Sequence, residues 1–545
     1  MKLPKEKIKI YGPIILAIVL IIGIILGNVL NRSISSKQRT ATIEQGKLSK
    51  ITNYIERNYV DTVNTDKMVE AAIPAMLKEL DPHSVYIPAK KLQRVSDPLE
   101  GNFDGIGIQF NMQKDTIIVI SVISGGPSEM VGIQPGDRII EVNDSTVAGV
   151  KMPSSKIVNM LKGKRGTKVD VTVKRPGDPN LLNFTITRDK IPYYSVDVSY
   201  MVNESTGYIK ISRFAKTTKK EFLKGLEKLK EKGVKNLIID VRSNNGGYLN
   251  AATSIIDQFL KKDELIVYTE GKNSPKQEIR ATSRGMAQDI DVAVMIDEWS
   301  ASASEIMAGA IQDNDRGIIV GRRSFGKGLV QEQRKLSDGS AIRLTVARYY
   351  TPTGRCIQKP YENGRQDYAK DIQERFEQGE FFHADSIDFA DSLKYKTPEG
   401  DIVYGGGGIM PDYFVPADTT DNSKFLSKVS NNGLIYEFSF NYADQHRNKL
   451  EKFETPTEME KYLDSENIYS QFLSYVYSHN VSKDIKGEEK SKKVINTRVK
   501  AYIARNILNN EGYYPIIKNI DHTLKKTIKI MENKELAISE VKVNI

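Results

Sequence analysis

The stretch LIIDVRSNNGG, residues 237–247, decides the fold class of this chain. It begins with five residues typical of a buried strand and continues into a polar loop that ends in two glycines. A helical pattern follows over residues 249–260. The same order recurs downstream, where the apolar run VAVMI, residues 292–296, precedes a turn and a helical pattern over residues 302–312. Repeated strand–loop–helix units predict an α/β core whose two loops share one edge of the sheet.

The second loop places serines at the start of a helix. Its sequence is SASASE, residues 300–305. Unpaired backbone N–H groups and the helix dipole favour negative charge at a helix N-terminus, which suits an alkoxide or an oxyanion. The glycines of the first loop offer another backbone N–H for a substrate carbonyl oxygen. Each feature also has an ordinary structural interpretation, since serine is a common helix cap and paired glycines are common in tight turns.

A nucleophilic serine needs a base, and no histidine lies near either loop in the sequence. Lys327 is the alternative, because Gly326 and Gly328 flank it and apolar Phe325 and Leu329 come next. Desolvation lowers the pKa of a lysine, which lets its amine accept a proton near neutral pH. From these residues alone, the commoner interpretation of Lys327 remains a solvated lysine on the protein surface.

The same lysine fits two other motifs, and each lacks a required part. GRRSFGKG, residues 321–328, has the spacing of a Walker A loop, but Gly328 stands where a Ser or Thr must bind magnesium. SFGK, residues 324–327, fits the SxxK motif of penicillin-binding enzymes, but the partner SDN and KTG motifs are absent from the sequence. A nucleotide site and a penicillin-binding-type enzyme are therefore both disfavoured.

Two further patterns lie upstream of the α/β core. Residues 42–80 have helical spacing, and the predicted buried positions there are Ile51, Ile55, Met68, Ala72, Met76 and Leu77. From residue 101 to residue 189, short β-branched strands alternate with glycines and predict a small, mostly β module. After residue 412 the pattern becomes helical to the end of the chain. That tail fits a docking arm, an oligomerisation element or a cap on the core, and the sequence does not choose among them.

The N-terminus predicts a membrane anchor. Residues 10–30 carry no charged side chain and are long enough to cross the hydrocarbon core as a helix. Four lysines against one glutamate precede them, so the positive-inside bias predicts a cytoplasmic N-terminus. A cleaved signal peptide is the competing interpretation, but no small-x-small cleavage site follows the apolar run. The predicted location is a single pass through the inner (cytoplasmic) membrane, with the remainder on the periplasmic, extracytoplasmic side.

Composition excludes several classes of function. Cys356 is the single cysteine, so the chain has no internal disulfide and no cysteine-based metal cluster or redox pair. Five histidines without an HExxH motif give little support to a catalytic zinc site, and we predict no metal and no cofactor. We attribute the formal charge of +10 to solvated surface and predict no nucleic-acid partner, because an exported chain meets anionic envelope polymers more often than DNA.

Four stretches taken together resemble the carboxyl-terminal processing proteases, the serine proteases also called tail-specific. They are LDPHS with Tyr86, GIGI at residues 105–108, DVRSNNGG at residues 240–247, and SASASE joined to FGKGLVQ at residues 325–331. They occur in the order of that family and cover residues 40–415. The resemblance implies a Ser-Lys mechanism in which the middle serine of SASAS, Ser302, is the nucleophile. The family's lysine lies 25 positions on, at Lys327 (327 − 302 = 25), and Gln331 matches the glutamine that orients it.

The resemblance also implies an oxyanion hole and a peptide-binding domain. The backbone N–H groups of Gly247 and Ala303 would stabilise the tetrahedral oxyanion. Residues 101–190 would form a PDZ domain, which adds an extended C-terminal peptide to a sheet edge while backbone amides hold its carboxylate. The implied carboxylate loop is Gly105, Ile106, Gly107 and Ile108. From composition alone, these glycines fit a β-bulge equally well.

We therefore predict an α/β multidomain protein with five parts. They are residues 1–31 (cytoplasmic stub and transmembrane anchor), 40–100 (helical), 101–190 (PDZ), 191–415 (a ClpP/crotonase-like protease core) and 416–545 (helical extension). The predicted partners are protein or peptide substrates with free C-termini and the membrane, while a homo-oligomer or an adaptor protein is left open. The rival hypothesis is a PDZ scaffold with an inactive protease fold, and the presence of Ser302, Lys327 and Gln331 argues against it.

Overall fold

The computed structural model describes residues 17–24, 46–113, 115–387 and 391–533 of the chain. These fall into two compact units, Met1–Leu80 and Asp81–Ile545, and each is described by itself. Among the described residues, no helix combines the length and the apolar character needed to cross a bilayer. The predicted membrane span, residues 10–30, lies mostly outside the described residues, and residues 17–24 within it are helical.

The first unit contains two short helices between residues 46 and 80. They span residues 46–58 and α2 (Thr65–Lys78), so the helical pattern predicted for this stretch is present with a break between them. The predicted core is wrong at Ile51, Ala72 and Met76, which are exposed, and only Leu77 of the predicted positions is buried. Two short helices have too little surface to enclose a core of their own.

Residues 102–192 form the predicted β module. Its elements are β2 (Asn102–Gly105), β3 (Ile108–Gln113), β4 (Thr116–Val122), α4 (Pro127–Met130), β5 (Arg138–Val142), β6 (Ser145–Thr146), α5 (Ser154–Leu161), β7 (Lys168–Lys174), β8 (Leu181–Thr187) and β9 (Asp189–Pro192). The sheet order is β3-β4-β5-β7-β8, with β6 beside β5, and β2 pairs with β9. Alternate residues of β7 are buried, as the period of two predicts. Strand β3 pairs only with β4 among the described strands and therefore presents a free edge.

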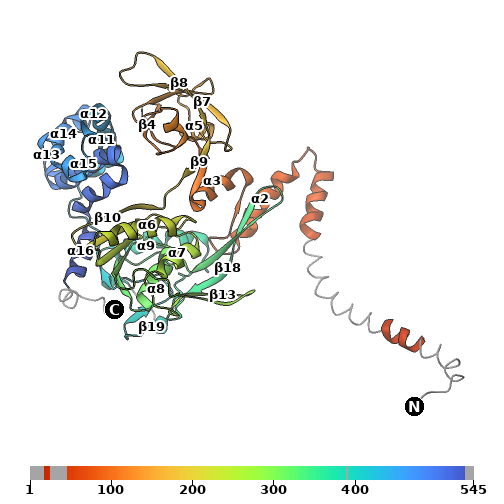
Figure 1. Cartoon of the computed structure of the whole chain (residues 1–545). Coiled ribbons are helices and arrows are strands. Elements are labelled where there is room, and N and C mark those ends of the chain that lie inside the picture. Colours follow the sequence, from red (N-terminus) through yellow and green to blue (C-terminus); the bar gives the residue numbers. More distant parts are fainter. Residues whose placement is uncertain (1–16, 25–45, 114, 388–390, 534–545) are drawn as a thin grey trace. The chain divides into compact units, whose positions relative to one another are not determined.

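A six-stranded sheet forms the core of the second unit (Figure 1). Its strands and the helices on one face are β10 (Val196–Met201), β11 (Thr206–Ile211), α6 (Thr218–Glu231), β12 (Asn236–Asp240), α7 (Leu249–Ile256), β15 (Asp291–Ile296), α8 (Ala303–Asp313), β16 (Gly317–Gly321) and β21 (Tyr413–Phe414). The strand order is β10-β11-β12-β15-β16-β21. Because β12 and β15 are parallel neighbours, the loops that follow them meet at one edge, which confirms the sequence-based prediction.

A second sheet carries the segment that follows Lys327. Its strands are β1 (Val85–Ile87), β13 (Leu265–Gly271), β14 (Ser274–Arg280), β17 (Leu329–Lys335) and β18 (Ala341–Tyr350). Strand β1 lies within the region 40–100 that was predicted to be helical, and it pairs with β18. Lys327 is therefore followed by a strand, not by a phosphate-binding helix. The remaining elements up to residue 404 are α3 (Ala89–Glu100), α9 (Arg365–Glu377), η1 (Ala384–Ser386), η2 (Asp391–Leu393), β19 (Lys394–Lys396) and β20 (Ile402–Tyr404).

The C-terminal region is helical, as the sequence predicts. Its helices are α10 (Lys424–Asn431), α11 (Leu434–Gln445), α12 (Arg447–Leu450), α13 (Pro456–Ser465), α14 (Ile468–Ser478), α15 (Ile485–Ile517), η3 (Lys518–Ile520) and α16 (His522–Glu532). Helices α10 to α15 enclose a core of their own. Helix α16 returns to the sheet, where Leu524 packs with Ile238 of β12 and Met295 of β15. Neighbouring residues of β12, such as Leu237 and Ile239, face the helices on the opposite side. Both faces of the sheet are therefore covered, which accounts for the continuous apolar run in β12.

Candidate active site

A groove of about 1580 Å³ opens where the loops after β12 and β15 meet. Its lining includes the five residues predicted for catalysis, which are Ser302, Lys327, Gln331, Gly247 and Ala303. Residues of α3 and β18 line other parts of the same groove. The fold therefore brings together five predicted residues that are up to 84 positions apart in the sequence (331 − 247 = 84).

Ser302 is the N-cap residue of α8 and has a strained backbone. Its φ of 57° and ψ of −113° lie in a region that residues with a side chain rarely adopt, at a cost on the order of 1–3 kcal/mol. Two neighbours hold this conformation. The backbone N–H of Ser302 donates to Glu305 Oε2 at 2.7 Å. The Tyr349 hydroxyl lies 3.2 Å from the Ser302 carbonyl oxygen and 2.6 Å from the Lys327 carbonyl oxygen, and it shares its proton between the two. The serine hydroxyl is thus carried on a fixed turn at the positive end of the helix.

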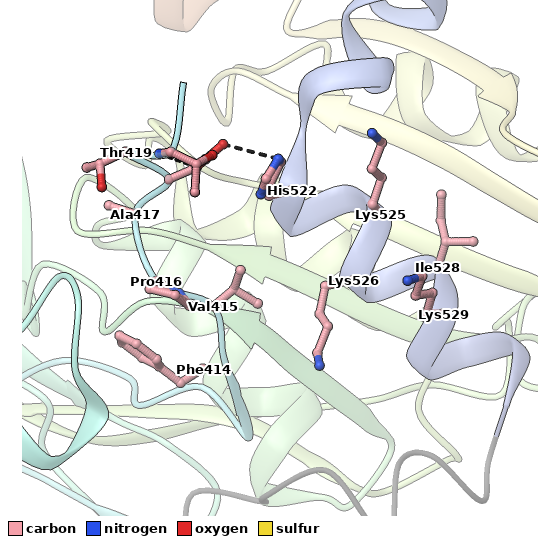
Figure 2. Close-up of a pocket in the computed structure, with 12 residues that line it drawn as sticks. Phe414, Val415, Pro416, Ala417, Thr419, His522, Lys525, Lys526, Ile528 and Lys529 are labelled. Carbon is pink, nitrogen blue, oxygen red and sulfur yellow. Dashed lines mark hydrogen bonds and ion pairs between the residues drawn. The ribbon is translucent and has the colours of Figure 1, made fainter. Parts of the chain in front are cut away.

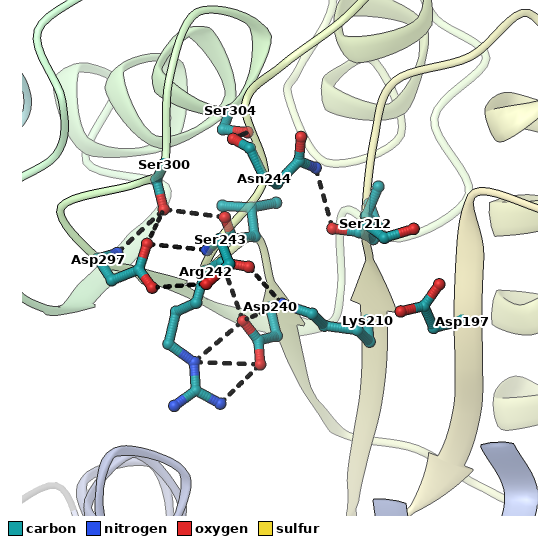
Figure 3. A network of polar contacts seen from close by, with 12 residues as sticks. Asp197, Lys210, Ser212, Asp240, Arg242, Ser243, Asn244, Asp297, Ser300 and Ser304 are labelled. Atoms are coloured by element: carbon teal, nitrogen blue, oxygen red, sulfur yellow. Dashed lines mark hydrogen bonds and ion pairs between the residues drawn. The ribbon is translucent and has the colours of Figure 1, made fainter. Parts of the chain in front are cut away.

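Asn244 fixes the glycine loop against the serine loop, and the sequence did not single it out. Its carbonyl oxygen accepts from Ala301 N at 3.0 Å and from Ser304 Oγ at 2.8 Å. Its side-chain amide donates to the Ile211 carbonyl oxygen at 2.9 Å, and its Oδ1 accepts from Gly246 N at 2.8 Å. Asn244 is completely buried, and Figure 3 shows it close to Ser304. The two loops are therefore one hydrogen-bonded structure.

The two glycines of the first loop have no room for a side chain. A Cβ on Gly246, which has φ +95°, would lie 2.8 Å from Ser302 Cβ. A Cβ on Gly247, which has φ +149°, would lie 2.1 Å from the Phe214 carbonyl oxygen. In the described part of the chain, the backbone N–H groups of Gly247 and Ala303 donate to no protein acceptor. Gly247 and Ala303 both line the groove, so these N–H groups are available there as donors.

Lys327 has the properties of a base. Burial, followed by repulsion from Arg343, lowers the pKa of its amine from 10.5 to about 8, while Glu305 acts in the opposite direction. Its Nζ donates to Gln331 Oε1 at 3.0 Å. No hydrogen bond joins Nζ to Ser302 Oγ among those of the described residues. The lysine and the serine therefore share the groove, and the lysine amine is held by the glutamine in this conformation.

Glu305 connects the serine segment to the lysine segment. Its Oε1 accepts from Ser324 Oγ and from Gly326 N, both at 2.6 Å, and its Oε2 accepts from Lys327 N at 2.9 Å as well as from Ser302 N. Burial raises the pKa of this carboxyl, and the four donors act to lower it. Four donors suit an ionised carboxylate, which can only accept. The sequence contained one signal for this residue, because Ser302 to Glu305 has the S-x-x-E spacing of a capping box.

Gln331 is held in turn by the chain after residue 80. Its Nε2 donates to the His83 carbonyl oxygen at 2.6 Å. Asp81 Oδ1 shapes that turn by accepting from His83 N at 2.9 Å, from Ser84 N at 3.0 Å and from the Thr345 hydroxyl at 3.0 Å. The LDPHS stretch therefore contributes a backbone carbonyl to the site.

The His83 ring does not serve as the base in this arrangement. Burial and the nearby charge of Lys327 lower the pKa of His83 to about 4, so the ring is neutral at pH 7. Its Nε2 is hydrogen-bonded to the Tyr368 hydroxyl at 2.8 Å. His83 also does not line the groove that contains Ser302.

Family models match four segments of the chain. Residues 205–365 match peptidase family S41, residues 105–187 match the PDZ domain, residues 28–91 match the activating protease CtpB N-terminal domain, and residues 425–509 match a family of unknown function. The carboxy-terminal processing protease CtpA of Bacillus subtilis is 33% identical over 358 residues, which cover 65% of this chain and 76% of that protein. The chain belongs to the carboxy-terminal processing protease family. This finding confirms the predicted PDZ domain, the predicted serine peptidase class and the α/β core with its helical tail.

Other members of the carboxy-terminal processing protease family are similar over the same region. CtpB of Bacillus subtilis is 37% identical over 316 residues, which cover 57% of this chain and 65% of that protein. Among solved structures, the photosystem II D1 C-terminal processing protease is 26% identical, and the match covers 57% of this chain and 89% of that chain with a TM-score of 0.32.

The PDZ loop predicted to bind a carboxylate lies between β2 and β3. Gly105, Ile106 and Gly107 are buried, and Ile108 begins the edge strand β3. The Ile106 carbonyl oxygen accepts from Ser128 N at 3.1 Å and from Ser128 Oγ at 2.6 Å, so the loop carbonyls are engaged within the domain. The loop is therefore fixed next to the free edge of the PDZ sheet that β3 provides.

A second hollow, of about 700 Å³, lies away from the residues predicted for catalysis. It forms between residues 414–420 and helix α16 (Figure 2). Lys525, Lys526 and Lys529 of α16 line it, and His522 pairs with Asp418 at 3.1 Å beside it. None of the predicted site residues belongs to this hollow.

Proposed function

We propose that this protein is a serine endopeptidase that binds the C-terminal ends of protein substrates through its PDZ domain and cuts near them with a Ser302-Lys327 dyad. The observation that carries the proposal is the groove itself. It combines a serine at a helix start, a lysine whose pKa is lowered to about 8, and the two free N–H groups of Gly247 and Ala303.

In the proposed reaction, neutral Lys327 takes the proton from Ser302 Oγ. A pKa of about 8 leaves roughly one lysine in ten neutral at pH 7. The serine alkoxide attacks the scissile carbonyl, and the oxyanion accepts hydrogen bonds from Gly247 N and Ala303 N. Protonated Lys327 then gives its proton to the leaving amine. Lys327 next takes a proton from water, and the resulting hydroxide hydrolyses the acyl-enzyme, which regenerates Ser302.

The reaction requires a movement of the lysine amine. Nζ donates to Gln331 Oε1 in this conformation, and it must turn toward Ser302 Oγ when a substrate is bound. Catalytic hydrogen bonds are often absent before substrate binding and form only in the complex. Gln331 would hold the amine in the groove between turnovers, because its own Nε2 is fixed by the His83 carbonyl oxygen.

Substrate recognition is proposed to use the free edge of β3. An extended peptide added to this edge would form main-chain hydrogen bonds, and the N–H groups of the loop from Gly105 to Ile108 would hold its terminal carboxylate. We also propose the domain boundaries 101–190, 191–415 and 416–545, with a ClpP/crotonase-like core. An uncleaved N-terminal anchor with the protease on the extracytoplasmic side is proposed from the apolar run of residues 10–30 and the lysines before it.

The decisive experiment compares cleavage and binding in single variants. Ser302→Ala and Lys327→Ala are expected to lose cleavage of a peptide with a free C-terminus but to keep binding it. Lys272→Ala, an exposed lysine between β13 and β14, serves as the control and should cleave normally. Undiminished cleavage by Ser302→Ala would refute the assigned nucleophile. A wild-type protein that binds peptides and cleaves none would favour the inactive scaffold.

A further inference from the structure

The groove around Ser302 carries an excess of positive charge. One acidic residue, Glu100, lines it, and Lys216 pairs with that carboxylate at 2.6 Å. The field in the groove therefore attracts anionic peptide segments and disfavours cationic ones. The six cationic lining residues are Arg213, Lys216, Lys219, Lys327, Lys335 and Arg343.

Arg343 is the cation that lowers the pKa of the proposed base, Lys327, the most. Its charge is the second-largest cause that lowers the pKa of Lys327, after burial. Burial also lowers the pKa of Arg343 itself. Its Nη2 donates to Gln333 Oε1 at 3.0 Å, which is a neutral amide, and none of the ion pairs between described residues includes Arg343. A half-buried cation without a carboxylate partner costs free energy that an anionic ligand would offset.

Arg213 supplies a second guanidinium with spare hydrogen-bonding capacity. Its Nη1 is buried and has no hydrogen-bond partner among the described residues, and the group lies over the Tyr193 ring at 4.4 Å. Arg213 immediately precedes Phe214, whose backbone pairs with Gly247. Arg213 therefore lies on the oxyanion side of the groove and Arg343 on the lysine side.

We propose that Arg343 binds a carboxylate of the substrate beside the scissile bond, so that this protease prefers peptides with an acidic group near the cut. The planar guanidinium can take a carboxylate with two parallel hydrogen bonds, which a lysine cannot do. The carboxylate comes either from an Asp or Glu side chain or from the free end of the substrate. This inference rests on the proposed function and adds the chemistry of its substrate.

The test uses peptide pairs that differ by Glu or Gln at one position near the cut, each with a free or an amidated C-terminus. The wild-type protein is expected to cleave the favoured carboxylate peptide with a kcat/KM about tenfold higher than its neutral partner. Arg343→Gln should lose this ratio. Arg348→Gln, on the same strand and bonded to the Tyr361 hydroxyl, should keep it because Arg348 does not line the groove.

The pattern of the ratios identifies the source of the carboxylate. If the Glu peptide is cleaved faster than the Gln peptide, the carboxylate that Arg343 binds is a side chain. If the preference disappears when the C-terminus is amidated, the carboxylate is the free end of the peptide. Equal ratios for wild type and Arg343→Gln, or no preference at all, overturn the inference. The affinity of Ser302→Ala for the same peptide pairs is measured as well. This variant should still bind the carboxylate peptide more tightly although it cleaves neither, so the test is independent of the catalytic proposal.

A second observation concerns the C-terminal helix α16, independent of the groove charge. Asp521, the N-cap residue of α16, accepts from Arg242 Nη1 at 3.0 Å and from Nη2 at 2.6 Å, and its Oδ1 also accepts from Leu524 N at 2.9 Å. The other carboxylate on Arg242 is the buried Asp240, at 2.7 Å from Nη2. Arg242 is thus held between the core strand and the C-terminal extension. Figure 3 shows its bonds to Asp240.

Arg242 directly precedes the loop that supplies the oxyanion donor. Its carbonyl oxygen accepts from Lys210 Nζ at 2.5 Å, and the next residue, Ser243, donates from its N to Asp297 Oδ1 at 2.8 Å. The loop from Ser243 to Gly247 therefore begins at a point that Asp521 helps to fix. We infer that Asp521 is a positioning residue, through which the C-terminal extension sets the orientation of the Gly247 N–H.

The test is a double-mutant cycle on the full chain. Asp521→Asn is expected to lower kcat about tenfold with little change in KM, because the oxyanion hole acts in the transition state. Glu511→Gln is the control, since it removes another ion pair between the C-terminal region and the core, Lys228–Glu511 at 3.2 Å, that does not contact the loop. Asp521→Asn combined with Arg242→Lys should cost less than the sum of the two. Additive losses, or equal losses in the Glu511→Gln control, overturn the inference.

Discussion

In the proposed mechanism only neutral Lys327 accepts the Ser302 proton, so cleavage is expected to increase with pH through one ionisation near pH 8. An ordinary lysine with pKa 10.5 is neutral in roughly one molecule in 3000 at pH 7, whereas a pKa of about 8 leaves roughly one in ten. The lowered pKa thus supplies roughly 300 times more of the active form at neutral pH. Because the charged lysine is the inactive form, activity is lost as the pH falls below 8.

Arg343→Gln is the perturbation that tests this explanation. Repulsion from Arg343 lowers the pKa of Lys327, so its removal should raise that pKa and move the ascending limb of the profile to higher pH. Each unit of upward shift reduces the rate at pH 7 about tenfold, while the two proteins converge at high pH. Burial is the larger cause of the lowered Lys327 pKa, and the substitution leaves it unchanged. The ascending limb of the Arg343→Gln profile should therefore still lie at a lower pH than that of an exposed lysine.

The assay is kcat/KM for an internally quenched peptide without acidic residues, measured from pH 6 to pH 10 at constant ionic strength. Such a peptide separates the effect on Lys327 from any effect on carboxylate binding. Arg348→Gln on the same strand is the control and should give the wild-type profile. A flat wild-type profile between pH 7 and pH 9, or the same limb for Arg343→Gln, would refute the assignment of Lys327 as the base.

Three other substitutions test the support of the dyad. Glu305→Gln places an amide among donors that need a buried acceptor, and it should lower the free energy of unfolding by about 3–5 kcal/mol. A urea titration measures this loss, and an unchanged midpoint would contradict the role of Glu305 as the acceptor that joins the two segments. Gly246→Ala puts a methyl group 2.8 Å from Ser302 Cβ and should reduce kcat/KM at least 100-fold with an unchanged circular dichroism spectrum, so normal activity would show that the loop tolerates displacement. Gln331→Ala releases the lysine amine and should lower kcat about 10- to 100-fold with KM unchanged; a rise in KM alone would assign Gln331 to substrate binding instead.

The sequence predicted the core because its signals are local. The run at residues 237–239 is apolar, since β12 is covered on both faces, and the strand–loop–helix order repeats at residues 292–312. A parallel arrangement of these strands was enough to place both loops at one edge. The positions of Ser302 and Lys327 in the groove therefore followed from strand order and from the resemblance together.

The supporting contacts were not predictable because their partners are distant in sequence. Glu305 and Ser324 are 19 positions apart, Gln331 and His83 are 248 apart, and Arg242 and Asp521 are 279 apart. In each case the sequence shows a polar residue and not the hydrogen-bond partner that folding brings to it.

The error in the N-terminal unit has a different cause. Helical spacing indicates which face of a helix is apolar, but not whether anything packs on that face. Ile51 and Met76 therefore matched the pattern and are exposed in the structure.

The central claim is that Lys327 activates Ser302 for attack on a carbonyl. The most direct test is mass-spectrometric mapping of the acyl-enzyme formed with an activated peptide ester, quenched with acid at early times. One acylated peptide is expected, which contains Ser302, forms faster as the pH rises through 8 and is almost absent in Lys327→Ala. Acylation of Ser324 or of any other residue, or acylation of Ser302 at the same rate in Lys327→Ala, would contradict it.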